Sequence, residues 1–250
     1  MADTSKAAGK PAGRQARQPA DTGSPWRSSV APDRDNRAWF EQIYRQADGD
    51  VEAVPWGRRG RSDPLARWLD DLAADPANAA VLNGAGRRAL VVGCGLGGHA
   101  VRLAGLGFTV TAFDIAETAV AWAAERHAGH GITFVVADLL RPPAEWRGGF
   151  DLIVEAMTLQ TLPGDGRHHA MRQLAAMLMP GGHLLLVASG RDAGQSPEWP
   201  LSEEQLAGLE RAGLVRWRFD IQWREMAGER RRLFRAVYQR PPDGAAKPAP

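Results

Sequence analysis

This 250-residue sequence has almost no cysteine: Cys94 is the only one. A single thiol forms no internal disulfide and builds no cysteine-rich metal site. Chains with so little cysteine are typical of reducing compartments. We therefore expect a cytoplasmic protein that holds no metal.

Long apolar runs and a strong charge of one sign are also absent. No stretch approaches the roughly 20 apolar residues of a membrane-spanning helix, and the amino-terminal segment lacks the apolar core of a secretory signal. The 31 Lys and Arg against 29 Asp and Glu leave a formal net charge of +2, which does not indicate nucleic acid as a partner. The sequence has no heptad pattern that would indicate a partner subunit. We expect a soluble protein that acts on a small molecule, with a monomer favoured.

Large apolar side chains are scarce at both ends of the chain. Residues 1–36 and the Pro-rich residues 241–250 cannot bury enough apolar surface to offset the entropy of ordering them. We therefore predict disordered tails at 1–36 and 241–250, with one domain over 37–240. Within that domain, 37–86 are expected to form a helical cover and 87–240 the sheet core.

Three short apolar, β-branched segments end in glycine or aspartate, namely 88–98, 108–114 and 132–138. Such segments are typical of buried parallel strands, and the stretches between them have the length of helices. Ligands bind where the carboxyl ends of parallel strands meet. The glycines after the first strand allow a sharp turn and close approach of a ligand, whereas Asp114 and Asp138 can accept hydrogen bonds from a ribose and from an exocyclic amine. The pattern predicts a pocket for an adenosine with a small 5′ group.

In these segments the chain resembles the class I S-adenosylmethionine-dependent methyltransferases. The resemblance extends over about residues 39–240 and includes 150–155 and 178–187, which are similar to the fourth and fifth strands of that family. It implies S-adenosyl-L-methionine as the cofactor and an α/β fold with a Rossmann-like, doubly wound, mostly parallel seven-stranded sheet. The residues implied to bind the cofactor are Gly93, Cys94, Gly95 and Gly97, then Asp114 and Ile115, then Asp138 and Leu139.

The carboxyl-terminal third supports this resemblance. Ser202 and Gln205 have the spacing of a capping box, which predicts a helix start, and two strand-like stretches follow at 214–223 and 231–240. The methyltransferase sheet closes with such an antiparallel hairpin, which a dinucleotide-binding fold is not expected to have.

Two other functions stay open. The pattern G-x-G-x-x-G is also satisfied by Gly93, Gly95 and Gly98, and Asp114 lies at the offset expected for dinucleotide binding. The first alternative is therefore an NAD(P)- or flavin-dependent oxidoreductase. A non-catalytic regulatory protein that binds S-adenosylmethionine is the second alternative. We favour the methyltransferase because of Asp138, the apolar fifth strand and the closing hairpin.

The residues before the sheet are expected to cover the cofactor. Helical spacing at 37–44 and 64–72 flanks a loop that contains Trp56. This arrangement resembles the amino-terminal cover of thiopurine S-methyltransferase-like and tellurite-resistance methyltransferases. The resemblance implies that Trp39, Tyr44 and Trp56 line the sulfonium end of the site, and it favours a thiol, selenol or other chalcogen acceptor over an oxygen or nitrogen one. Simple packing of these aromatics on the sheet edge is the alternative.

The end of the fourth strand is expected to border the acceptor. Methyl transfer from a sulfonium is an in-line displacement with a neutral leaving group, so a strong base is optional. Glu155 is a candidate either for a general base or, as we favour, for a ligand of the methionine ammonium. Thr158 and Gln160 are candidate acceptor contacts, and Arg58 either attracts an anionic acceptor or solvates its loop.

Two further positions concern local structure. Cys94 lies between two glycines, and we interpret it as a small residue tolerated by tight packing rather than a nucleophile. Ala116 stands where many family members have a helix-capping serine, a loss that typically destabilises a helix by ~1 kcal/mol.

Overall fold

The computed structural model describes residues 36–57, 63–191, 200–226 and 229–244. The tails predicted at 1–36 and 241–250 fall mostly outside these residues, although Asn36 already begins the first helix. Arg58 also lies outside the described residues.

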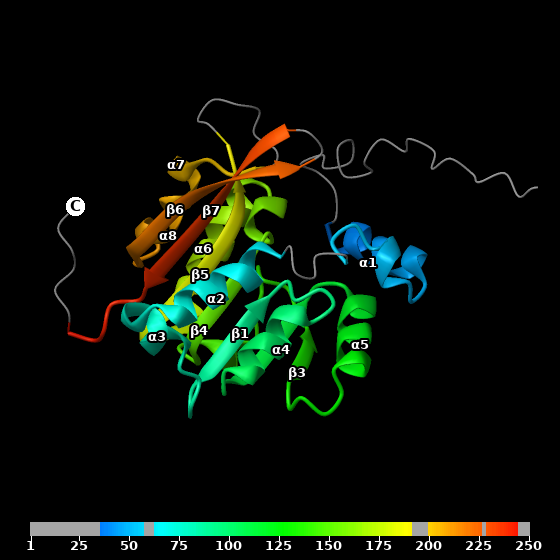
Figure 1. The fold of residues 1–250 in the computed structure, drawn as a ribbon, viewed down its shortest axis with the longest axis horizontal. Coiled ribbons are helices and arrows are strands. Elements are labelled where there is room, and N and C mark those ends of the chain that lie inside the picture. The colour runs from blue at the N-terminus through cyan, green and yellow to red at the C-terminus, as the bar shows by residue number, and fades with distance from the viewer. Residues whose placement is uncertain (1–35, 58–62, 192–199, 227–228, 245–250) are drawn as a thin grey trace, which may run out of the picture. The chain divides into compact units, whose positions relative to one another are not determined.

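Seven strands form one sheet in the order β3-β2-β1-β4-β5-β7-β6 (Figure 1). β1 to β5 pair in parallel, whereas β7 pairs antiparallel with both β5 and β6. This confirms the predicted fold class, including the closing hairpin. The strands are β1 (Arg88–Val92), β2 (Thr109–Asp114), β3 (Thr133–Val136), β4 (Phe150–Ala156), β5 (Leu178–Gly190), β6 (Val215–Met226) and β7 (Glu229–Gln239).

The helices before the sheet confirm that residues ahead of β1 are helical. They are α1 (Asn36–Ala47), the 3-10 helix η1 (Val51–Ala53), α2 (Pro64–Ala74) and α3 (Pro76–Leu82). α2 starts where it does because the carboxylate of Asp63 accepts the N–H groups of Leu65 and Ala66, with Pro64 in the first turn. The later helices are α4 (Gly98–Gly105), α5 (Glu117–Arg126), η3 (Ala144–Trp146), η4 (Leu159–Thr161), α6 (Gly164–Met177), α7 (Glu203–Leu206) and α8 (Gly208–Arg211).

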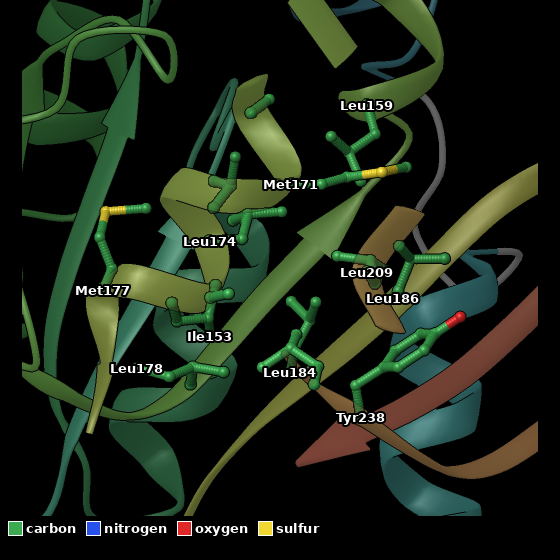
Figure 2. Packing of buried hydrophobic residues seen from close by; sticks show 14 of the residues in the cluster. Ile153, Leu159, Met171, Leu174, Met177, Leu178, Leu184, Leu186, Leu209 and Tyr238 are labelled. Atoms are coloured by element: carbon green, nitrogen blue, oxygen red, sulfur yellow. The ribbon is translucent and has the colours of Figure 1, made fainter. Parts of the chain in front are cut away.

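Buried apolar side chains form a core on each face of the sheet. One core joins the sheet to α6, α7 and α8, and the other joins it to α2, α3 and α4. Figure 2 shows Met171 and Leu174 of α6 in the first core, together with Ile153 of β4 and Leu184 of β5. Because helices cover both faces, the central strands are apolar on both sides. Polar ligand groups therefore find partners at the carboxyl edge of the sheet.

Several strand boundaries differ from the sequence prediction. β3 ends at Val136, so Asp138 lies two residues beyond the strand rather than at its last position. β6 extends to Met226, three residues further than predicted, because its cross-strand pairing with β7 continues to Glu229. Among the described residues, no helix has both the length and the apolarity needed to cross a membrane.

Candidate functional site

A glycine loop connects β1 to α4 at the carboxyl edge of the sheet. Gly93, Gly95 and Gly97 have φ values of +57°, +51° and +81°, which side chains strongly disfavour. A Cβ on Gly93 would collide with the hydroxyl group of Thr158, and one on Gly95 would lie 3.0 Å from the hydroxyl of Tyr44. The loop is therefore closed tightly by neighbouring side chains, and only glycine fits at these positions.

Asp114, the last residue of β2, holds the glycine loop in place. Its Oδ2 accepts the N–H of Gly95 at 2.9 Å and its Oδ1 accepts the N–H of Ala116 at 3.0 Å. Burial raises the pKa of this carboxyl, although the two amides act in the opposite direction. A carboxylate offers about four lone-pair positions, so these two bonds leave acceptor capacity for a ligand.

Asp138 and Leu139 lie beside Asp114 at the next strand. The N–H of Ala137 donates to the backbone oxygen of Asp114 at 3.0 Å, which holds the two strand ends together. Asp138 Oδ1 accepts the N–H of Leu140 at 2.8 Å, while the side chain of Leu139 is buried in the core. Ile115, which follows Asp114, is half-buried. The structure thus brings the predicted ribose and adenine residues to one edge.

An aromatic cluster from the cover lies against the same loop. The indole Nε1 of Trp56 donates to the hydroxyl of Tyr44 at 2.7 Å, and the ring of Trp39 lies 6.5 Å from that of Trp56. Tyr44 is 1% exposed and also contacts the ring of Trp122. Tyr44, packed inside the protein, and the half-buried Trp56 therefore lie beside Gly95, and Trp39 lies beside Trp56.

Glu155 is a completely buried carboxyl near the end of β4, next to Val92 of β1. Its Oε1 accepts the N–H groups of Thr158 at 2.5 Å and Leu159 at 2.9 Å. Its Oε2 has no hydrogen-bond partner among the described residues. Burial raises the pKa of Glu155 to about 7, because it outweighs the stabilisation of the charged form by the two amides.

The turn after β4 is fixed from its other side by Arg167. This buried guanidinium donates to the backbone oxygens of Leu159 at 3.2 Å and Leu162 at 2.7 Å. Met157 has a φ of +68°, a conformation that a bulky residue adopts only where its surroundings enforce it. Two opposed side chains thus hold the segment that was predicted to border the acceptor.

The candidate acceptor residues Thr158 and Gln160 make contacts within the protein. Thr158 Oγ1 lies 3.4 Å from the backbone oxygen of Val92, and Gln160 Oε1 accepts the N–H of Ser189 at 2.8 Å. Gln160 therefore connects the turn to β5. Cys94 is buried, and burial raises the pKa of its thiol well above the usual range.

An Asp–His pair that was not predicted from the sequence lies beside the glycine loop. His99, at the start of α4, places its Nε2 2.8 Å from Oδ2 of Asp63. Burial would raise the pKa of Asp63, but the hydrogen bond and charge of His99, together with the amides of α2, lower it to about 2. The one available signal was Asp63 followed by Pro64, which is typical of a helix start. Within the described ranges no group of three or more His, Cys, Asp or Glu is arranged to hold a metal.

Comparisons with known proteins agree with this geometry. A family model described as a methyltransferase domain matches residues 89–182. That range contains the glycine loop, Asp114, Asp138 and Glu155.

Solved structures share the fold across most of the chain. The [4+2]-cyclase SpnF is 20% identical, with a TM-score of 0.65 over 81% of this chain and 95% of its own. The 1,6-didemethyltoxoflavin-N1-methyltransferase of Burkholderia thailandensis, solved with S-adenosylhomocysteine, is 20% identical, with a TM-score of 0.63 over 82% and 87% of the two chains. The N-methyltransferase NodS of Bradyrhizobium japonicum, also with S-adenosylhomocysteine, is 24% identical, with a TM-score of 0.58 over 80% and 98%. The chain has the Rossmann-like fold of the class I methyltransferases.

Proposed function

We propose, from the premise that residues 89–182 are a methyltransferase domain, that this protein transfers a methyl group from S-adenosylmethionine to a small-molecule acceptor. The observation that carries the proposal is the position of Asp114. Its carboxylate fixes the glycine loop by accepting the N–H of Gly95 and still has lone pairs that can accept from a ligand. Asp138 follows the adjacent end of β3, which is joined to Asp114 through the N–H of Ala137. This combination of backbone amides and two carboxylates suits the hydroxyl and amine donors of a nucleoside.

The cofactor residues have distinct tasks in this proposal. Asp114 accepts the ribose hydroxyls, Asp138 accepts the adenine amine, and Ile115 and Leu139 contact the adenine ring. The glycine loop from Gly93 to Gly97, with Cys94 as a small residue, lies under the methionine portion. Support comes from the strand pairing, which places these residues at adjacent carboxyl ends.

Glu155 is proposed to bind the methionine ammonium. A fully buried carboxyl with one unpartnered oxygen is expensive to keep charged, and a cationic ligand removes that cost. Its other oxygen is already fixed by the amides of Thr158 and Leu159, so the group is oriented before a ligand arrives. A role as general base is the alternative for this residue.

S-adenosylmethionine supplies an electrophilic methyl carbon on a sulfonium when it is bound. The hydroxyl of Tyr44 and the indole edge of Trp56 lie beside Gly95. We propose that the half-buried ring of Trp56 contacts the sulfonium, because an aromatic face favours a cation. We propose a thiol, selenol or other chalcogen as the acceptor, because such nucleophiles need no strong base. Trp39, Arg58, Thr158 and Gln160 are the proposed acceptor contacts, and we expect a monomer that acts in the cytoplasm.

Titration calorimetry with S-adenosylhomocysteine tests the cofactor assignment. We expect saturable binding by the wild type and at least about tenfold weaker binding by Asp114→Asn. In the variant, the side-chain NH2 group would face the backbone N–H of either Gly95 or Ala116, and two donors cannot form a hydrogen bond. Tight binding of NADH without binding of S-adenosylhomocysteine would replace this proposal with an oxidoreductase.

A turnover assay must accompany the titration, because the similar structures include a cyclase. We would supply S-adenosylmethionine labelled in its methyl group together with a panel of thiols, chalcogen oxyanions, phenols and amines. Label recovered in a thiol or chalcogen product supports the acceptor class. Label recovered only in phenols or amines would contradict it and leave methyl transfer intact.

A further inference from the structure

The pair of Asp63 and His99 lies at the edge of the sheet that holds the glycine loop. Asp63 is the N-cap of α2, and His99 is the second residue of α4, which begins directly after the loop. His99 is the fourth residue after Gly95, so the chain spans at most ~14 Å between their Cα atoms. The first side chain after Gly97 and Gly98 is thus an imidazole close to the loop proposed to lie under the methionine portion.

Both oxygens of the Asp63 carboxylate are engaged. Oδ1 accepts the N–H of Leu65 at 2.9 Å and that of Ala66 at 3.3 Å, and Oδ2 lies 2.8 Å from Nε2 of His99. Burial alone would raise the pKa of Asp63, but the bond and charge of His99 and the two amides hold it at about 2. Asp63 is therefore an anion at neutral pH, and its orientation is fixed by the start of α2.

This carboxylate decides which ring nitrogen of His99 carries the proton. An ionised carboxylate can only accept, so Nε2 donates, and Nδ1 of the neutral ring keeps a lone pair. The side chain of His99 is 19% exposed, and its Nδ1 has no hydrogen-bond partner within the described ranges. The pair thus presents a basic nitrogen whose direction Asp63 holds constant.

Other charged side chains near the pair come from α2, α4 and β6. Arg102 of α4 pairs with Asp70 of α2, further along both helices. Burial and the charge of Arg67 lower the pKa of Arg224, whereas the charge of Asp63 raises it, so Arg224 lies within electrostatic range of Asp63. The group in direct contact with the imidazole is the carboxylate, which stabilises the ring after it takes up a proton.

We propose that His99 accepts the proton of the methyl acceptor and that Asp63 positions it for this task, an inference that rests on the proposed function. Nδ1 takes the proton from an S–H or Se–H group, and the electron pair released on that atom forms the bond to the methyl carbon. The electrons of the broken C–S bond stay on the sulfonium sulfur, which becomes neutral. Asp63 stabilises the imidazolium until the proton passes to solvent through the exposed part of the ring.

An imidazole has the right strength for this class of acceptor. A thiol has an ordinary pKa of about 8.5 and a free imidazole one of about 6.5, so proton transfer between them is only slightly uphill. An alcohol is a far weaker acid and would need a much stronger base. A histidine at this position therefore favours a thiol or selenol over an alcohol.

The first test compares His99→Gln with the wild type, because glutamine can still donate to Asp63 but cannot take up a proton. Transfer to benzyl mercaptan, which is mostly protonated at pH 7, should fall about tenfold or more at pH 7. The loss should shrink below about threefold at pH 9.5, where much of this thiol ionises without a base, and also with 4-nitrothiophenol, which is ionised at pH 7. Saturating S-adenosylmethionine is used throughout, because Glu155 also titrates in this range. His168→Gln, at an exposed position of α6, is the matched control and should transfer like the wild type.

Histidine ¹⁵N chemical shifts of the labelled full-length protein test the same geometry without turnover. We expect neutral His99 to carry its proton on Nε2 in the ligand-free protein. We also expect its Nδ1 resonance to shift when benzyl mercaptan is added to the complex with S-adenosylhomocysteine, and the resonances of His168 to stay unchanged.

Four results would overturn the proposal. They are a proton on Nδ1 of neutral His99, no response of His99 to the thiol, an equal loss in His99→Gln at both pH values and with both thiols, and no transfer to either thiol by the wild type. The third would assign a purely structural role to the pair. His99→Gln should bind S-adenosylhomocysteine like the wild type, so these results leave the cofactor assignment intact, whereas absence of that binding in the wild type would refute the proposed function itself.

Discussion

Glu41 of α1 caps the amino terminus of α5 by accepting the backbone N–H of Thr118 at 3.0 Å and its hydroxyl at 2.5 Å. The N-cap position itself is Ala116, which has no side-chain acceptor, so the missing cap is supplied by another helix. Burial raises the pKa of Glu41, but the bonds from Thr118 outweigh it and leave that pKa below its ordinary value. Figure 1 shows α1 beside α5, so this contact connects the aromatic cover to the segment that follows Asp114.

Glu41→Ala should therefore destabilise the protein and loosen the cover. We expect the free energy of unfolding to fall by ~1 kcal/mol, the usual effect of losing an N-cap, and binding of S-adenosylhomocysteine to weaken with it. Urea denaturation and calorimetry measure the two effects. Gln46→Ala, at an exposed position of the same helix, is the control. Equal stability of both variants would show that the cap is unimportant.

The Asp63–His99 pair predicts a loss of stability in acid. The folded-state pKa of Asp63, about 2, lies below the ordinary value of 3.8, so the carboxylate stabilises the fold above about pH 4. That contribution, about 2 kcal/mol, disappears as the pH falls through 2. Denaturant titrations between pH 5 and 2 should show this slope in the wild type and a reduced slope in Asp63→Asn. Glu125→Gln, at an exposed position of α5, should keep the full slope.

Glu155 predicts a pH dependence of the opposite sign. Its folded-state pKa, about 7, lies above the ordinary value of 4.5, so the protonated form stabilises the fold below pH 4.5 and this stability is lost as the pH rises through 7. The ligand-free protein should therefore lose about 3 kcal/mol between pH 4.5 and 8 from this group. Glu155→Gln should remove that part of the slope in denaturant titrations. An unchanged slope in the variant would assign the pH dependence to other groups.

The proposed contact between Glu155 and the methionine ammonium predicts tighter cofactor binding at higher pH. The carboxyl must be ionised to bind a cation, so the affinity for S-adenosylhomocysteine should rise about tenfold from pH 6 to pH 8 and level off above pH 8. Calorimetry at each pH measures the effect, which should vanish in Glu155→Gln. Turnover that collapses in this variant while affinity stays unchanged would indicate a general base instead.

The glycine loop offers a matched pair of substitutions. Gly93→Ala should destabilise the protein by about 2 kcal/mol or more, because its φ of +57° disfavours a Cβ and that atom would collide with Thr158. Gly98→Ala adds a Cβ in open space at the first residue of α4, where alanine favours the helix. Thermal unfolding of both variants checks the difference. A similar loss in both would mean that the loop tolerates side chains.

Strand positions and their chemistry could be read from the sequence because they depend on local patterns. The alternation of apolar strands with helices predicted the parallel sheet, and the spacing of Gly93, Asp114 and Asp138 predicted residues at one edge. The Ser202–Gln205 capping box is present in the structure as predicted. Such features follow from the pleat and from the turn that each residue type permits.

Contacts between elements far apart in the chain were decided only by the tertiary structure. Nothing near Ala116 in the sequence indicates that Glu41, 77 positions before Thr118, supplies the cap of α5. The pairing of Asp63 with His99 likewise requires α2 to pack against α4. Burial also decides the pKa of Glu155, because the energy of a charge depends on everything that surrounds it rather than on its neighbours in the chain.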